Sequence, residues 1–470
     1  MTRPSPHLLL GVLVLLAGCK VGPDYQRPAA STDKAPPVAF KELAGWKPAA
    51  PAELADRGAW WSVFHDPELD GLEAQVEISN QTLLAAVAAY DQSVAVVATA
   101  RAALFPTLST APGVTRGQSA GSARARTTNT AELSASWELD VWGRLRRTVQ
   151  GDIATAQASA ADLANAKLSA QALLAVDYFE LRAADALKAL LDTTVADYRR
   201  ALEITNNQYK AGTAARSDVI TAQTQLQGAI SQSINAGVQR ALLEHAIAVL
   251  TGHPPASLTL DAAPLASVVP VVPAGLPSEL LERRPDIAAA ERMMAAQNEQ
   301  IGVAIAAYYP QISLSAVYGF SGSPLSALFN SANRVWSLGA SANETLFNGG
   351  DFAADVRVAR AVYDGAVATY RQTVLTAFQQ VEDQLSTLRI LQDQYAAQQE
   401  AVSLAQRAVD VTLNQYRAGT ITYTAVITAQ NTLLTDQQTL VSLQQQRLVA
   451  SVTLVQAVGG GWSASALPKL

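Results

Sequence analysis

The sequence is poor in the residues that build metal sites, disulfide frameworks and charged binding surfaces. Its 470 residues include one Cys, four His and three Met, and charged residues make up only 16%. A single Cys excludes an internal disulfide. The net charge is −6 with Lys and Arg scattered, so nucleic-acid binding has little electrostatic support. The four His make no metal-ligand spacing, and no phosphate-binding Gly loop or Ser nucleophile elbow is present. We therefore expect no catalytic residue, metal site or cofactor.

Long apolar runs are also scarce. After the first twenty residues no uncharged apolar stretch reaches the ~18 residues of a membrane-spanning helix, so we expect none in the mature chain. Disorder is not indicated either, because hydrophobic residues make up 49% and recur periodically. Much of this fraction is Ala, and the polar fraction is rich in Gln, Ser, Thr and Asn. The composition predicts a long, helical, weakly charged protein.

The N-terminus has the layout of a secretory signal. Arg3 supplies charge, residues 8–16 form a short apolar core, and the sequence LAG precedes Cys19. This order resembles the lipobox of bacterial lipoproteins, which implies a covalent lipid on Cys19. Because Lys20 and not Asp follows, it also implies an outer-membrane destination. The alternative is a chance Cys after an ordinary signal peptide. The Pro-rich residues 19–55 should run extended along the body, or serve simply as a linker.

The chain contains an internal duplication. NQYKAGT from Asn207 recurs as NQYRAGT from Asn414, and VITAQ from Val219 recurs from Val426, an offset of 207 residues. In each half, two strand-like runs lie between long helical stretches. We expect strands at residues 107–114 and 130–140 in the first half and at 311–320 and 336–346 in the second. Each pair should form one β-hairpin. In the second half, Ile312, Leu314, Ala316 and Tyr318 alternate with Ser313, Ser315 and Val317, as expected for a strand.

The helical stretches are unusually long. Residues 145–211 lack Pro and contain one Gly, which predicts a helix of ~67 residues and about 100 Å, and residues 352–418 repeat it. Such lengths require coiled-coil packing. Gly212 and Gly419 should end these helices, and a second helix should return from each tip. A heptad seam supports this packing: Leu191, Val195, Tyr198, Leu202, Thr205 and Tyr209 in the first half, and Val402, Ala405, Val409, Thr412 and Tyr416 in the second.

Several short motifs occur in one order along nearly the whole mature chain: VGPDY from Val21, WW at Trp60, RPD from Arg284, the paired YxAGT tips and GGGW from Gly459. Together they resemble the outer membrane factor family, the TolC-like channels, and in particular its NodT-type efflux lipoproteins. The resemblance implies a mainly α chain with a β-barrel portion, internally duplicated and trimeric. Its α-helical tunnel would lie in the periplasm and join a 12-stranded outer-membrane barrel, to which each chain gives about four strands. Four strands cannot close a membrane barrel, but three chains supply twelve.

The resemblance also implies a function and partners. We expect the exit duct of a tripartite efflux system that passively conducts small molecules or drugs, as a homotrimer with a periplasmic adaptor protein, an inner-membrane pump and outer-membrane lipids as partners. A duct for type I protein secretion or metal-ion export is the alternative. A purely structural coiled-coil lipoprotein is disfavoured by the paired hairpins. The sequence does not identify the transported substrate.

The hairpin tips are the candidate gate. By resemblance they lie at the periplasmic entrance, where channels of this family often carry Asp rings. Asp218 occupies such a position, whereas its second-half counterpart is Ala425. Our hypothesis is that polar groups there contribute to gating or ion selectivity, while the alternative for Asp218 is a helix N-terminal charge favoured by the dipole. The candidate gate and tip residues are Asp218, Arg216, Tyr209, Tyr416, Gly212 and Gly419.

These features divide the chain as follows. The predicted segments are a signal peptide (1–18), a lipidated extended segment (19–55), a first repeat (56–251), a Pro-rich equatorial linker without helix (252–278), a second repeat (279–458) and an equatorial tail (459–470). For Trp60, Trp61 and Trp462, packing in the equatorial region is favoured over anchoring at an interface.

Overall fold

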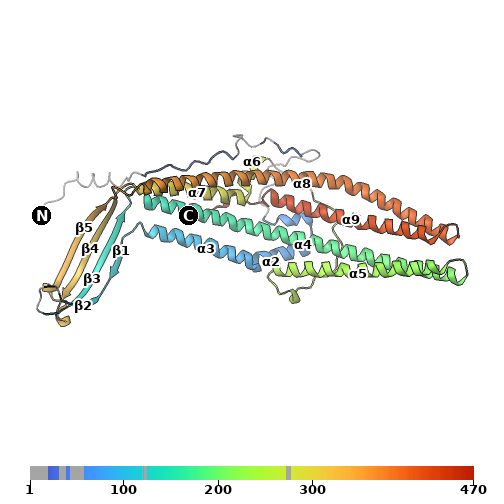
Figure 1. The fold of residues 1–470 in the computed structure, drawn as a ribbon, viewed down its shortest axis with the longest axis horizontal. Coiled ribbons are helices and arrows are strands. Elements are labelled where there is room, and N and C mark those ends of the chain that lie inside the picture. Colours follow the sequence, from blue (N-terminus) through green and yellow to red (C-terminus); the bar gives the residue numbers. More distant parts are fainter. Residues whose placement is uncertain are drawn as a thin grey trace.

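The computed structural model describes residues 20–30, 37, 39–42, 58–118, 120, 124–270, 272 and 277–470. Cys19 and the predicted signal peptide lie outside the described residues. The chain forms a long bundle of helices with a sheet attached at one end, and the two helical tips lie at the opposite end (Figure 1). The mostly helical fold with a small sheet agrees with the predicted class.

Two helices of equal length span the bundle. α4 (Arg144–Lys210) and α8 (Asp351–Arg417) each have 67 residues, as the sequence predicts. Each turns back into a 35-residue helix, α5 (Arg216–Leu250) or α9 (Tyr423–Ala457). The turns need glycine, because Gly212 and Gly419 have φ of +74° and +71°, in the left-handed region that ends helices.

The predicted heptad seam is buried along most of its length. Leu191, Val195 and Tyr198 are buried on α4, and Ala405 and Val409 on α8. The prediction is wrong at one end, since Tyr209 is 44% exposed.

Shorter helices complete the bundle. α2 (Pro67–Ser79) begins at Asp66, whose side chain accepts hydrogen bonds from the N–H groups of Glu68 and Leu69. α3 (Gln81–Ala102) packs along α4, and α7 (Pro285–Ala306) lies between α4 and α8 (Figure 1). By length and composition α3 alone among the described helices could cross a membrane, although Asp91 interrupts its apolar run and only 11% of the window is buried.

The linker between the repeats is almost free of helix. One 3-10 turn at Pro255–Ser257 and the start of α6 (Pro277–Arg283) are the exceptions to the predicted absence within the described residues. Both begin at Pro, because the first helical turn does not use the missing N–H.

The sheet is antiparallel and joins the two halves. Its strands are β1 (Thr107–Thr110), β2 (Gly113–Gly117), β3 (Arg126–Leu139), β4 (Gln311–Gly322) and β5 (Arg334–Asn343). β3 pairs with β4 across the halves. The prediction of one strand at 107–114 is wrong in detail, because Ala111 and Pro112 interrupt it, and Pro cannot donate to the ladder. Since β1 and β2 both pair with β3, they act as one broken strand, which makes four across the sheet.

One face of the sheet is apolar and the other polar. Residues directly opposite in an antiparallel pair share a face, and Leu133, Tyr318 and Trp336 stand opposite one another on three neighbouring strands. Ser134 and Val317 stand opposite each other on the other face. Apart from Val317, most residues of that face are small and polar. These include Thr130, Ser136, Ser313, Ser315, Ser321, Ser337 and Ser341. This alternation, predicted for residues 312–318, is typical of a membrane barrel with a polar interior.

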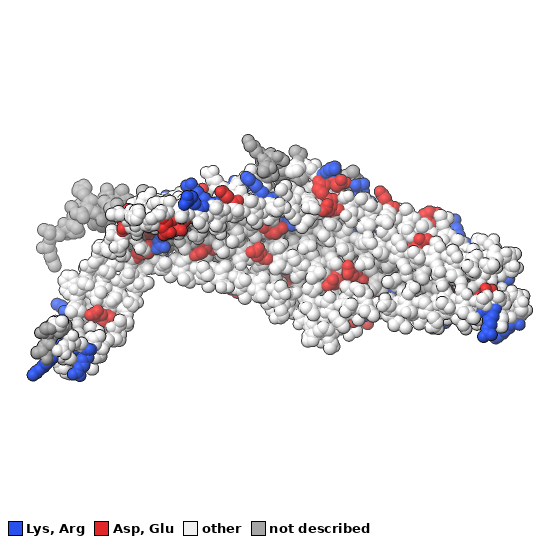
Figure 2. All heavy atoms as spheres, viewed as in Figure 1, with Lys and Arg blue, Asp and Glu red and all other residues white. Residues whose placement is uncertain are grey.

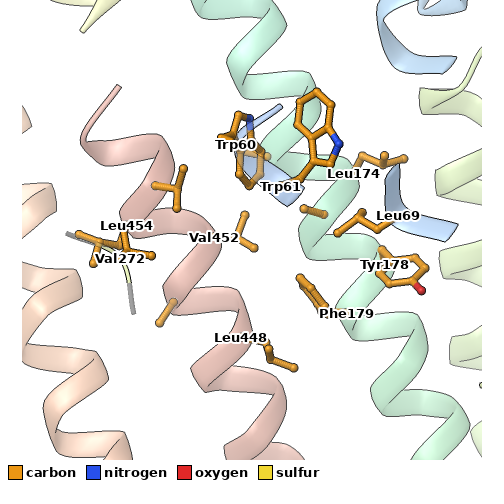
Figure 3. Close-up of a cluster of buried hydrophobic side chains, with 14 of the residues drawn as sticks. Trp60, Trp61, Leu69, Leu174, Tyr178, Phe179, Val272, Leu448, Val452 and Leu454 are labelled. Carbon is orange, nitrogen blue, oxygen red and sulfur yellow. The ribbon is translucent and has the colours of Figure 1, made fainter. Parts of the chain in front are cut away.

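The largest apolar core lies midway along the bundle. Trp60 and Trp61, which are 2% and 7% exposed, pack against α4 residues including Leu174 and Phe179 and face α9 (Figure 3). Their rings meet edge to face, with centroids 5.7 Å apart. The prediction that these two tryptophans pack inside the protein is therefore confirmed, and the equatorial placement of this region stays a prediction. Trp462 is half-buried against a cluster of small Ala residues from α4 and α7.

Candidate functional site

The two helical hairpins are in contact near their tips, mainly through residues of the second repeat. Tyr416 at the end of α8 and Tyr423 at the start of α9 are buried with Ala222 of α5 and Val426. The two rings lie 5.2 Å apart. The Gln208 amide also donates to the Tyr416 carbonyl at 3.5 Å. These contacts hold the α8–α9 hairpin against the α4–α5 hairpin near the tips, at the end of the bundle opposite the sheet.

The predicted tip residues take two kinds of position. Arg216 and Tyr209 are exposed, and Asp218 is half-buried in the first turn of α5, where its N–H donates to the Ala215 carbonyl. Tyr416 is only 5% exposed and belongs to the contact between hairpins. The position of Asp218 suits the helix-dipole alternative as well as a gate, so its role stays a prediction.

Burial keeps the tip phenols neutral. It raises the pKa of Tyr423 to about 12, and it also raises the pKa of Tyr416. Neither ring can therefore supply charge near neutral pH. The charge at the tips comes from the exposed Lys210, Arg216 and Arg417, set against Asp218 (Figure 2). This end is thus net basic in a chain whose overall charge is −6.

The hairpins are less closely packed further from the tips. A cavity of about 340 Å³ lies between α4 and the α8–α9 pair, with Tyr198, Leu413 and Gln430 in its wall. Asp197 and Arg200 from α4 and Asp410 and Arg417 from α8 also line it. Tyr416 and Tyr423, with Ala222 and Val426, form what we call the tyrosine cluster. This cluster joins the two hairpins next to a loosely packed, polar part of the bundle.

A second polar site holds the N-terminal segment that follows Cys19. The fully buried Arg147 of α4 donates to the carbonyls of Val21, Gly22 and Pro23, and to Glu299 of α7 at 2.8 Å. A buried Arg satisfied by three carbonyls and one carboxylate avoids the cost of an unpaired charge. Gly302 makes this possible, because a Cβ there would lie 2.1 Å from Arg147 Cδ.

Further contacts continue this site along the extended segment. Tyr25 donates to Glu291 at 2.5 Å, and Arg27 donates to the Tyr370 hydroxyl of α8. Burial and the neighbouring carboxylate raise the pKa of Tyr25. The segment 20–30 thus ties α4, α7 and α8 together, as the dark blue trace along the bundle shows (Figure 1).

Sequence reasoning missed Arg147 and Glu299. The sequence contains one signal for this site. Gly302 interrupts a stretch that otherwise favours helix, and a Gly inside a helix often marks the close approach of another group. The RPD motif connects two helices. The structure shows that the Arg284 guanidinium pairs with Asp286 and donates to the Ala457 carbonyl, which joins the end of α9 to the start of α7.

Comparison with known proteins agrees with this architecture. The model of the family described as outer membrane efflux protein matches residues 73–253 and 276–460. The toluene efflux pump outer membrane protein TtgC of Pseudomonas putida is 32% identical over 470 residues, covering 95% of this chain and 94% of that protein. The pyoverdine export outer membrane protein OpmQ of Pseudomonas aeruginosa is 32% identical over 429 residues, covering 87% and 89%.

Solved structures show the same fold. The outer-membrane channel OprN superposes with a TM-score of 0.88 at 28% identity, covering 94% of this chain and 100% of that one. These findings define the class as a TolC-like outer-membrane channel. The chain belongs to the outer membrane efflux protein family, and it is an efflux channel of the outer membrane.

Proposed function

We propose that three copies of this chain form a passive exit duct, which takes small molecules from a periplasmic adaptor and an inner-membrane pump and releases them outside. The observation that carries the proposal is that one chain leaves open a helix face and two sheet edges that its own repeats cannot fill. The proposed duct has no catalytic activity and no cofactor other than the lipid expected on Cys19.

The open helix face follows from the duplication. α4 packs between α3 and α7, whereas α8 packs on α7 and shows no comparable contact with α3 in the described residues. Gly151 of α4 approaches Ala296 and Glu299 of α7. By the repeat, Val358 of α8 should face α3 of a neighbouring copy, near Val96. Both valines are exposed in the single chain, by 61% and 46%. A second copy would cover them.

The sheet supports the same assembly. β1 and β2 at one edge and β5 at the other each pair on one side only among the described strands. Open edges carry unpaired N–H and C=O groups, which a bilayer does not tolerate. With four strands across each sheet, three copies give the twelve of the expected barrel, above the minimum of eight.

The tips are the proposed gate and adaptor-docking end. The tyrosine cluster holds the hairpins together, and the cavity behind it leaves room for one hairpin to move against the other. Exposed Arg216 and half-buried Asp218 are placed to affect ion passage at this end. The names of the relatives specify toluene for TtgC and pyoverdine for OpmQ, so we propose small organic molecules as the cargo class for this chain.

The test combines assembly, conduction and cargo. The full chain purified from outer membranes should migrate as a heat-modifiable trimer and form ion-conducting channels in planar bilayers. Deletion of the gene should sensitise the host to part of a panel of toxic organic compounds, and the wild-type sequence should restore resistance. A monomer in the outer-membrane fraction, or a trimer that conducts no ions, would contradict the proposal.

The lipid is tested separately. Cys19→Ser should remove labelling by radioactive palmitate, while labelling that persists would refute the anchor at this residue.

A further inference from the structure

The end of the sheet remote from the helices carries more positive than negative charge. Its acidic residue Glu132 is next to Leu133 on β3 and therefore lies on the opposite, polar face. Between residues 103 and 131, and between residues 311 and 343, there is no Asp, Glu or Lys. These stretches contain four arginines, Arg116, Arg124, Arg126 and Arg334. Basic side chains are visible at this end of the molecule (Figure 2). In a protein of net charge −6 this is a local excess that the efflux function does not use.

Strand register assigns two of these arginines to the apolar face. Arg116 on β2 stands opposite Thr127 of β3, which shares a face with Leu133 because the two are six residues apart. Arg334 stands opposite Phe320 and shares a face with Trp336. Arg126 begins the same strand as Thr127 and points to the opposite, polar face.

The two arginines lie on the outer part of the apolar face, at different levels of the sheet. Through Phe320, Arg334 is level with Ala131 of β3, whereas Arg116 is level with Thr127. On β2 the last apolar residue of that face is Val114, and on β5 it is Trp336. Each arginine lies two residues from it along its own strand, toward the end of the sheet remote from the helices. Aromatic rings mark the level of Arg334, where its register partner Phe320 packs against Tyr318 and Phe329. Val114 and Trp336 are 67% and 68% exposed, as expected for side chains that face lipid. Aromatic girdles mark the boundary between acyl chains and headgroups in membrane barrels.

We propose that Arg116 and Arg334 form a docking site for the phosphate groups of a phosphorylated glycolipid in the outer leaflet of the outer membrane. The inference rests on the proposed function, because it requires the sheet to close as a barrel in that membrane. Both side chains are exposed, and they stand at the headgroup level on the lipid-facing side. The planar guanidinium matches a phosphate with two parallel hydrogen bonds, and no acidic side chain of these stretches competes for it. The site would fix the depth of the barrel from the outside.

The experiment measures phosphate-dependent lipid binding by the purified, delipidated full-length trimer. The probes are bisphosphorylated lipid A, the same lipid A with both phosphates removed, and inorganic phosphate at equal phosphorus concentration. Binding is followed by native mass spectrometry and by the lipid-induced rise in the temperature of trimer dissociation. We expect the phosphorylated lipid to bind at least about tenfold more tightly than the dephosphorylated one, a ratio set by charge-assisted hydrogen bonds.

The variants separate the two faces of the sheet. Arg116→Gln combined with Arg334→Gln should abolish the preference for phosphorylated lipid. Arg126→Gln, the matched control at the same end but on the polar face, should retain it. Equal binding of both lipids by the wild type would overturn the proposal even if the double variant did not assemble. Equal protection by inorganic phosphate, or loss of the preference in Arg126→Gln, would overturn it as well.

Conductance of the same wild-type preparation distinguishes the two proposals. Channels without phosphate-dependent binding refute only the lipid site, whereas a preparation without channels refutes the exit duct.

Discussion

α4 and α8 have the same length and the same place in their repeats, yet they are buried very differently. In α4 buried residues run from Leu145 to Thr205, whereas in α8 the first buried residue is Tyr370. α4 lies between α3 and α7, and the early part of α8 has α7 on one side only within the described residues. Burial therefore follows the place of a helix in the assembly more than its own composition. The second repeat leaves open the face that the first repeat fills.

The largest effect is expected where this open face should be covered by another copy. Val358→Asp combined with Val362→Asp should abolish the heat-modifiable trimer, because the assembly would have to bury two unpaired carboxylates. Both valines are exposed in the single chain and lie one helical turn apart. Trimer content of outer-membrane extracts measures the outcome. Val268→Asp, at a position 77% exposed in the linker, is the control and should leave the trimer intact.

The next effect contrasts the buried start of α4 with the exposed start of α8. Arg147→Met should destabilise the protein by about 3–5 kcal/mol, because Glu299 and three backbone carbonyls lose a buried partner. The exposed Arg357 on α8 is the matched control, and Arg357→Met should change stability by less than about 0.5 kcal/mol. Denaturant unfolding of the detergent-solubilised chain measures both. Equal losses of stability in the two variants would show that Arg147 contributes no more to stability than an exposed arginine.

A smaller, pH-dependent effect on stability contrasts the buried carboxyl of Glu73 on α2 with the exposed carboxyl of Glu282 on α6. Burial raises the pKa of Glu73 to about 9, and in the described part of the chain neither of its carboxylate oxygens has a hydrogen-bond partner. The folded state thus keeps a proton that the unfolded state releases above about pH 4.5. Stability is therefore lost as pH rises toward 9.

Glu73→Gln removes this loss. The variant should gain stability over the wild type as pH rises, by up to roughly 3 kcal/mol at pH 7. Glu282→Gln, at an exposed position of α6, should show no such trend. Unfolding midpoints between pH 5 and 8 check the slope, and a gain that shrinks as pH rises would refute the assignment of a neutral Glu73.

The smallest effect contrasts the two tips. Asp218→Ala should lower the cation preference of single channels by about twofold, because a partly exposed carboxylate acts through a screened field. Ala425→Asp, which gives the second tip the acidic residue that it lacks, should raise the preference by a similar factor. Conductance and reversal potentials in salt gradients measure both. If neither substitution moves the reversal potential, Asp218 serves only the helix terminus.

Local pattern was enough to predict much of the fold. The 207-residue duplication, the absence of Pro over 67 residues and the Gly at each tip predicted α4, α8 and their turns to within a residue. Heptad spacing predicted the burial of Leu191 and Val409. The alternation in residues 312–318 predicted the apolar face of β4. Each of these signals is carried by neighbours in the sequence, so each can be read without knowing what packs against it.

The candidate sites depended on contacts that no local pattern contains. Arg147 resembles any other charged residue at the start of a helix until α7 and the N-terminal segment close around it. Tyr416 belongs to the predicted heptad seam and is buried, whereas no pattern pointed to its neighbour Tyr423, because their contact needs the turn between α8 and α9. The register of β3 with β4, which joins the two halves, also required the tertiary structure.

The sequence by itself determined the repeat, the helix lengths and the alternation along β4, because periodicity and backbone preference act over a few residues. Only the tertiary structure decided which repeated faces are filled within one chain and which stay open, and which arginines stand at the edge of the apolar band. The physical reason is that burial and charge pairing depend on segments far apart in the chain, and two nearly identical helices differ only in what lies beside them.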